Sequence, residues 1–290
     1  MSIFTRIVLL SSIFLLAACQ SHSPSYKFAG NSDYQSKDSA EKEYVLQQAK
    51  NYSGLIEVYK ARLKNSEDRS TRFKLAEYYY QVNDYNSSVH YLSPLLQNAP
   101  DEHVYLLQAK NLAAQRQYKS AINFINMAIN KNPKSGESYN TKGIIMAENG
   151  QLVEATRAFE SARNLYVKDE IINNNLAMVE IFSQRYESAV RYLLPLYLRG
   201  YKEQNLTHNL VFALLKSGDY RYAKEIIEME NMAPYPDTLV EALADVTVQP
   251  YSPSASNDKV VAINSAKTTS ASFVPATPTL INTGPTSKKQ

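Results

Sequence analysis

A fixed interval between small residues is the feature that most constrains the fold of this chain. Ala121, Ala155, Ala189 and Ala223 follow one another at intervals of 34 residues. An ordinary helical bundle has no reason to keep a constant interval, whereas a row of identical supersecondary units does. Each such unit is too small to hide its apolar side alone, so it must stack on the next one. The interval therefore predicts an all-α solenoid.

Apolar residues within each unit recur at spacings of three and four, which is typical of amphipathic helices. We number the unit that begins at Glu102 from position 1. Small residues at positions 8 and 20 let two helices approach closely, and larger residues fill the space between neighbouring units. A proline at position 32 cannot continue a helix and ends it. The positions 4, 8, 11, 20, 24, 27 and 32 of this unit hold Tyr105, Ala109, Leu112, Ala121, Ile125, Ala128 and Pro133.

This pattern resembles the tetratricopeptide repeat (TPR). The resemblance implies a superhelix of helical hairpins in which the first helix of every hairpin lines a concave face. A degenerate capping hairpin is expected at 40–68 and a closing helix at 236–245. The five repeats are expected at 69–101, 102–135, 136–169, 170–203 and 204–235.

The first 18 residues have the features of a secretory signal. A positive start with Arg6 precedes the apolar run Ile7–Leu16, which is too short for the roughly 20 residues that span a bilayer. The run ends in Leu16-Ala17-Ala18-Cys19, which resembles the lipobox of bacterial lipoproteins, and Cys19 is the only cysteine of the chain. The resemblance implies a covalent lipid on Cys19 and, with Gln20 rather than aspartate next, the periplasmic face of the outer membrane more than the inner membrane.

Both ends of the mature chain have polar, aperiodic sequences. Residues 19–39 read as a flexible lipidated tether, and residues 246–290, rich in Ser, Thr and Pro, read as a disordered tail. Alternatively, the tail holds a short partner-binding strand at Val260–Ile263 or Phe273–Val274.

Composition and motifs argue against catalysis. The formal net charge of +3 is nearly balanced and offers no basic stripe for nucleic acid. The four histidines stand far apart, and no phosphate loop or nucleophile motif is present. We therefore expect no enzyme activity, no metal, no cofactor beyond the lipid, no small-molecule substrate and no nucleic-acid partner.

A protein-binding groove is the expected use of such a superhelix. Positions 5, 9 and 12 of the first helices give a groove that is apolar with a few amides, which suits an extended peptide or a helix. Several of these residues can instead serve only the packing between repeats. Position 2 lacks the basic residues with which some TPR proteins hold a terminal carboxylate. The candidate groove residues are Phe73, Glu77, Tyr80, Leu106, Lys110, Asn140, Ile144, Asn174, Met178, Ile181, His208, Phe212 and Leu215.

Three stretches carry a closer resemblance, namely residues 173–180, 184–197 and 209–226. They read NNNLAMVE, QRYESAVRYLLPLY and NLVFALLKSGDYRYAKEI and are similar to the TadD-like family of tight-adherence (Tad) pilus lipoproteins. The resemblance implies a scaffold in Flp pilus assembly, pilotin-like for the outer-membrane secretin through which the pilus emerges. The alternative is a periplasmic adaptor or regulator of peptidoglycan hydrolases or proteases.

Overall fold

The computed structural model describes residues 32–248, and it divides the chain into two compact units, residues 1–49 and 50–290. The first unit contributes one described helix, α1 (Ser32–Gln48), and the second contributes all the others. The predicted signal peptide, the lipidation site Cys19 and almost all of the predicted tail lie outside the described residues.

The prediction of a tether up to residue 39 was wrong at its end, because α1 already begins at Ser32. The hairpin predicted from residue 40 includes a helix there, but the earlier start of α1 was not predicted, because the helix has no apolar stripe and its described residues Tyr44 and Val45 are mostly exposed. Strong helix formers such as Glu41 and Lys42 support it instead. The hairpin predicted at 40–68 is not one unit, since α1 and α2 (Tyr52–Asn65) fall in different compact units.

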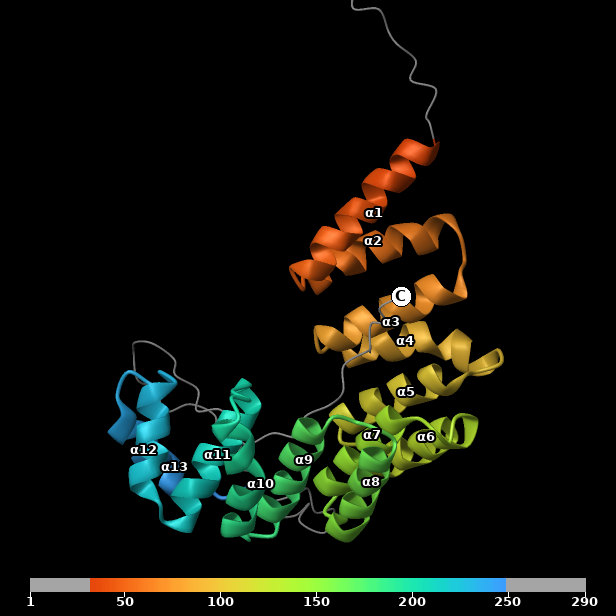
Figure 1. The fold of residues 1–290 in the computed structure, drawn as a ribbon. Coiled ribbons are helices and arrows are strands. Elements are labelled where there is room, and N and C mark those ends of the chain that lie inside the picture. The colour runs from red at the N-terminus through yellow and green to blue at the C-terminus, as the bar shows by residue number, and fades with distance from the viewer. Residues whose placement is uncertain (1–31, 249–290) are drawn as a thin grey trace, which may run out of the picture. The chain divides into compact units, whose positions relative to one another are not determined.

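The second unit is a row of antiparallel helix pairs, as Figure 1 shows. No strand occurs among residues 32–248, so the predicted all-α TPR superhelix is confirmed. After α2 come five pairs and a closing helix: α3 (Arg69–Gln81) and α4 (Tyr85–Gln97), α5 (Glu102–Ala114) and α6 (Tyr118–Lys131), α7 (Gly136–Glu148) and α8 (Leu152–Asn164), α9 (Asp169–Phe182) and α10 (Tyr186–Leu198), α11 (Gln204–Ser217) and α12 (Tyr220–Met229), then α13 (Pro236–Ala244).

The turn inside each pair closes in the same way. The residue at position 15 adopts a left-handed conformation, and the amide of the next residue bonds the carbonyl oxygen five residues back, which is a Schellman motif. Only two of these residues are glycines, so the other three accept a conformation that costs an ordinary residue about 1–2 kcal/mol. The five residues and their φ angles are Asn83 (61°), Arg116 (59°), Gly150 (79°), Gln184 (58°) and Gly218 (90°).

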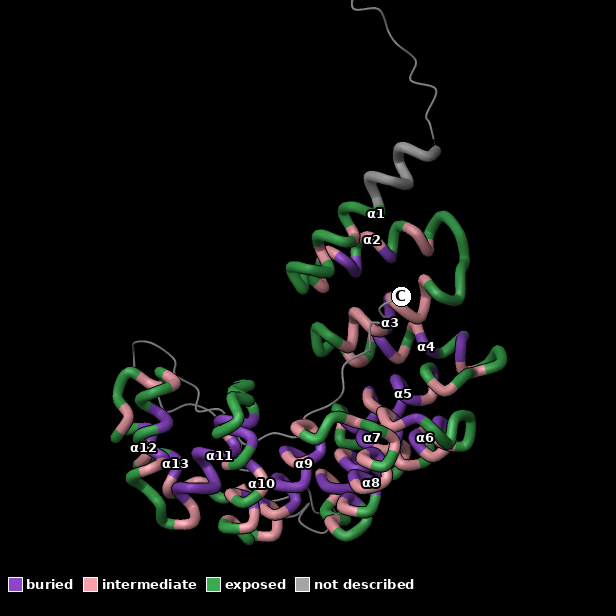
Figure 2. Tube along the Cα trace, viewed as in Figure 1, coloured by how far each residue is buried: buried purple, intermediate pink, exposed green. Residues whose placement is uncertain are grey.

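In the first four repeats a small residue at position 8 faces a large one at position 24, whereas the fifth repeat holds Val211 at position 8. In most repeats an alanine meets a leucine or isoleucine, but in the third repeat Gly143 meets Phe159. Phe159 is fully buried, and the ring fills the room that a Cβ on Gly143 would occupy. These buried positions form an almost continuous core through the row of helices (Figure 2).

Contacts between helices define an inner and an outer side of the second unit. Consecutive first helices touch, α3 with α5, α5 with α7, α7 with α9 and α9 with α11, whereas no pair of consecutive second helices from α4 to α12 does. The first helices are thus crowded along a shorter path and the second helices are spread along a longer one. The first helices therefore form the concave side, as predicted.

Candidate protein-binding surface

We define the concave face as positions 2, 5, 9 and 12 of the five first helices. The structure divides the thirteen predicted groove residues into two groups by burial. Six are half-buried and reach the surface: Phe73, Glu77, Tyr80, Lys110, Ile144 and His208. Seven are buried: Leu106, Asn140, Asn174, Met178, Ile181, Phe212 and Leu215.

The buried residues concentrate in the last two repeats. Met178 and Ile181 of α9 join Phe212 and Leu215 of α11 in one apolar cluster. Their side chains fill the contact between neighbouring first helices, which is the packing role that large residues have in stacked hairpins. The accessible part of the predicted groove is therefore richest in the first three repeats.

Charged side chains gather on the concave face of these repeats. Lys110 Nζ lies 2.7 Å from Glu137 Oε1, and the two side chains are only 10% and 20% exposed. Burial raises the pKa of Glu77, although the positive charges of Lys110 and Lys74 act in the opposite direction. The carboxylates of Glu77 and Glu137 thus lie among the ammonium groups of Lys74 and Lys110, so this part of the face is polar with balanced charge.

A chain of buried amides continues the face into the later repeats. Asn175 Nδ2 donates to Asn140 Oδ1 at 2.9 Å, and Asn209 Nδ2 donates to Asn174 Oδ1 at 2.8 Å. All four side chains are fully buried. Buried polar groups are costly to separate from their partners, so these bonds fix the register of α7, α9 and α11.

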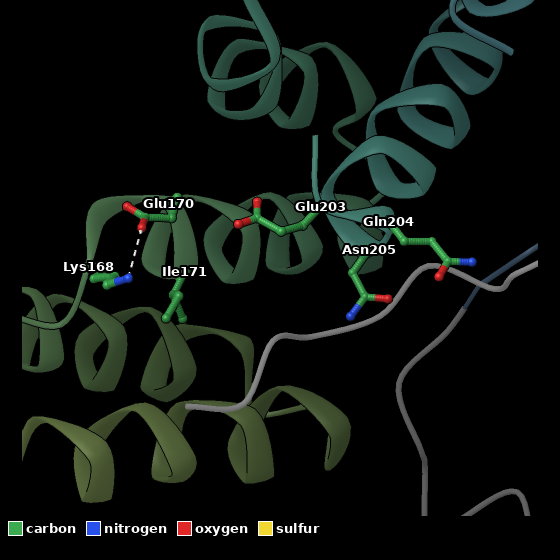
Figure 3. Close-up of a pocket in the computed structure, with 6 residues that line it drawn as sticks. All are labelled: Lys168, Glu170, Ile171, Glu203, Gln204 and Asn205. Carbon is green, nitrogen blue, oxygen red and sulfur yellow. Dashed lines mark ion pairs between the residues drawn. The ribbon is translucent and has the colours of Figure 1, made fainter. Parts of the chain in front are cut away.

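A pocket of about 310 Å³ lies at the edge of the concave face, at the first turns of α9 and α11 (Figure 3). Lys168 Nζ and Glu170 Oε1 lie 3.8 Å apart, and no side chain caps the first turn of α9 or α11. Glu170 and Glu203 supply acceptors here and the uncapped N–H groups of the two helix starts supply donors, so the pocket suits a ligand with both, such as a peptide amide. It is lined by Lys168, Glu170, Ile171, Glu203, Gln204 and Asn205.

This pocket was not predicted from the sequence, although two of its lining residues, Ile171 and Asn205, stand at position 2. Position 2 served there only as an argument against a carboxylate-binding clamp. The acidic residues Glu170 and Glu203 stand at or just before the helix starts, outside the positions projected onto the groove. Extending that projection to the residues that begin each first helix would have found them.

The described residues offer little for catalysis. Between residues 32 and 248 no three His, Cys, Asp or Glu side chains gather closely enough to hold a metal ion. Burial lowers the pKa of His208, which favours the neutral form of its imidazole. None of the helices from α1 to α13 is both long and apolar enough to cross a bilayer.

Comparisons with known proteins agree with this architecture. A family model described as the N-terminal acetyltransferase A auxiliary subunit matches residues 102–197, about a third of the chain. A TPR protein of Thermus thermophilus has a similar structure, with a TM-score of 0.55 and 18% identity over 62% of this chain and 98% of that one. No curated protein matches the sequence.

Two further solved structures are similar at comparable levels. A TPR protein from Parabacteroides merdae has a TM-score of 0.55 and 14% identity, covering 71% of this chain and 83% of its own. The C-terminal part of a TPR protein from Cytophaga hutchinsonii has a TM-score of 0.51 and 16% identity, covering 70% and 84%. The chain thus has the tetratricopeptide-repeat fold.

Proposed function

We propose that this chain is a lipid-anchored scaffold of Flp (Tad) pilus assembly that binds an extended segment of the outer-membrane secretin on its concave face. The observation that carries the scaffold role is a curved array whose first helices present half-buried aromatic and charged side chains along one face. Phe73, Tyr80 and Ile144 offer apolar contacts, and Glu77 and Lys110 offer polar ones. Such a mixture suits a peptide bound in extended form.

The anchoring part of the proposal is supported by the sequence. Leu16-Ala17-Ala18-Cys19 has the lipobox pattern after an apolar run, and Gln20 favours the outer membrane. A thioether-linked diacylglyceryl group and an acylated amino group together bind a bilayer far more firmly than the marginal binding of one chain. Lipid attachment would hold the concave face in the periplasm, close to the membrane in which a secretin assembles.

A gene deletion complemented in trans tests the role in the cell. The deletion strain should lose secretin multimers and surface pili, and the wild-type chain should restore both. The Ile171→Glu variant adds a third carboxylate to the pocket and should restore them poorly, whereas Val153→Glu, at a residue 61% exposed on α8, should restore them fully. Unchanged secretin multimers and pili in the deletion strain would refute the proposal.

Purified proteins test the contact itself. Periplasmic fragments of the secretin should bind the full chain, and Ile171→Glu should weaken that binding at least tenfold while Val153→Glu leaves it unchanged. Retention of a peptidoglycan hydrolase or protease, with no secretin binding, would overturn the pilotin-like role in favour of the adaptor role.

The lipid is tested separately. Cys19→Ser should release the chain from the outer-membrane fraction into the soluble periplasmic fraction. Membrane association that survives this substitution would contradict anchoring through Cys19.

A further inference from the structure

The concave face has a candidate ligand within the same chain. We propose that residues 249–290 bind along the concave face as an extended peptide and compete with the protein partner for it. The inference rests on the proposed function in one respect, because it takes the concave face to be a peptide-binding surface. It adds a regulatory element that keeps the surface occupied until a partner displaces it.

The helical array fixes the point at which this segment starts. Helix α13 contacts both α11 and α12, and Lys216 Nζ of α11 donates to the backbone oxygen of Ala244 at 2.7 Å. Val246 and Val248 are partly buried against the apolar cluster of the last repeats. The chain is therefore held to α11, one of the helices that form the concave face, up to the last described residue.

The segment is long enough to follow the whole face. Its 42 residues can span up to about 140 Å when extended. The face runs over five neighbouring helices, α3 to α11, and four steps of about 10 Å between packed helices amount to roughly 40 Å. A third of the segment is thus enough to reach from α11 to α3.

Charge and composition are complementary between the segment and the face. Four lysines and one aspartate give residues 249–290 a net charge of +3. Around the concave face and its pocket, four carboxylates and three ammonium groups give a net charge of −1, from Glu77, Glu137, Glu170, Glu203, Lys74, Lys110 and Lys168. Val260–Ile263 and Phe273–Val274 supply apolar side chains for the half-buried Phe73, Tyr80 and Ile144.

Covalent attachment makes even weak binding effective. A segment joined to its own site by a short flexible linker meets it at an effective concentration of about 1 mM. With an intrinsic dissociation constant of about 0.1 mM, the face would be occupied roughly ten times as often as it is empty. A partner would then bind with an apparent affinity lowered about tenfold.

Site-specific photo-crosslinking in the full chain tests the occupant directly. We would place p-benzoylphenylalanine at Asn205, an exposed residue of the pocket, in a Cys19→Ser chain that stays in solution. The expected product is a monomer in which this probe is joined to a peptide from residues 249–290. The same probe at Val153, on the outer helix α8, should give no such product. Crosslinks to other parts of the chain only, equal yields from both probes, or products of dimer size would overturn the inference.

Matched charge reversals test the recognition. Glu170→Lys with Glu203→Lys should reduce the crosslink from position 205 at least fivefold. Glu154→Lys with Glu187→Lys changes the net charge equally on exposed residues of the outer helices α8 and α10 and should leave the yield unchanged. Equal effects of the two pairs would refute recognition by the pocket.

Deleting residues 249–290 separates this inference from the proposed function. Secretin fragments should bind the shortened chain about tenfold more tightly than the full chain. If the crosslink forms but no secretin fragment binds either chain, only the pilus role fails. Should secretin bind both chains equally and the crosslink be absent, only the inference about the C-terminal segment fails.

Discussion

Substitution of Gly143 by alanine separates tertiary packing from helix propensity, because the two effects have opposite signs at this residue. Gly143 lies in the middle of α7, where alanine is favoured over glycine by about 1 kcal/mol. In an unconstrained helix the substitution would therefore be stabilising. We expect it to destabilise this protein instead.

The reason is the position of the Phe159 ring. A Cβ built on Gly143 would lie 2.5 Å from Phe159 Cδ1 and 2.8 Å from Cζ, and closer still to Cε1. Real Cβ atoms essentially never approach heavy atoms within 3.0 Å, and the fully buried ring has no open space into which to move. Overpacking of this kind costs about 1–3 kcal/mol. Set against the gain in propensity, the expected net loss is about 1 kcal/mol, or a fall in Tm of about 2–4 °C for a domain of this size.

A double-mutant cycle tests this packing explanation. Phe159→Leu alone leaves unfilled space and should cost about 1–2 kcal/mol. With Gly143→Ala it recreates the pair formed by Ala177 and Leu193 in the next repeat, and both of those residues are fully buried. The double variant should therefore be more stable than the sum of the single effects predicts, by about 1–2 kcal/mol.

Urea denaturation followed by helical circular dichroism at 222 nm measures all four corners of the cycle. A gain in stability for Gly143→Ala, or single effects that simply add, would refute the reasoning. Either result would mean that the ring yields to a methyl group without cost.

Three further predictions use other features of the array. At position 15 of the turns, Gln184→Gly should raise the free energy of unfolding and Gly218→Ala should lower it, each by about 1 kcal/mol, because the backbone of both residues is left-handed. Changes of the same sign in the two variants, measured by urea denaturation, would contradict this. Burial raises the pKa of Glu148 to about 7, although the charge of Arg116 opposes the shift. The Glu148 carboxyl group therefore loses its proton at a lower pH in the unfolded state than in the folded state, so the free energy of unfolding should fall as the pH rises from 4.5 to 7. Glu148→Gln should remove at least about 1 kcal/mol of that fall, which urea midpoints at pH 5 and pH 8 measure. A variant with the same pH profile as the wild type would argue against the burial of Glu148 as the cause. Asn209→Leu breaks the buried bond to Asn174 and should cost about 1–3 kcal/mol in the same denaturation assay, with no loss speaking against a structural role of the amides.

The repeat architecture could be predicted from the sequence because its signal is periodic. Small residues occupy position 20 of every hairpin and position 8 of the first four, so the same packing constraint is repeated along the chain. The closing helix was also marked, since Pro236 begins it at the first helical position. The start of helix α1 carried no such mark, because no residue in its described part is buried, so the sequence shows no apolar pattern there.

Accessibility of the groove was less predictable than its location. Positions 9 and 12 face the concave side in every repeat, yet Lys110 reaches the surface while Met178 and Phe212 are buried. The difference depends on how closely neighbouring first helices approach, which no single position in one repeat specifies. The pairing of Lys110 with Glu137 likewise joins residues of two repeats, so the position of each in its own helix could not reveal it.

The buried amide bonds also determine where the array can bend. Any change of curvature between α7, α9 and α11 would have to break a hydrogen bond that water cannot replace at once, so the last three repeats should move as one block. Between the first two repeats a buried bond of the same kind, from Asn111 Nδ2 of α5 to Ser88 Oγ of α4 at 2.8 Å, lies beside the exposed pair of Arg69 and Asp101. Bending near α4 and α5 would therefore also break a hydrogen bond that is shielded from water, so the array should resist a change in the width of the concave face at both ends.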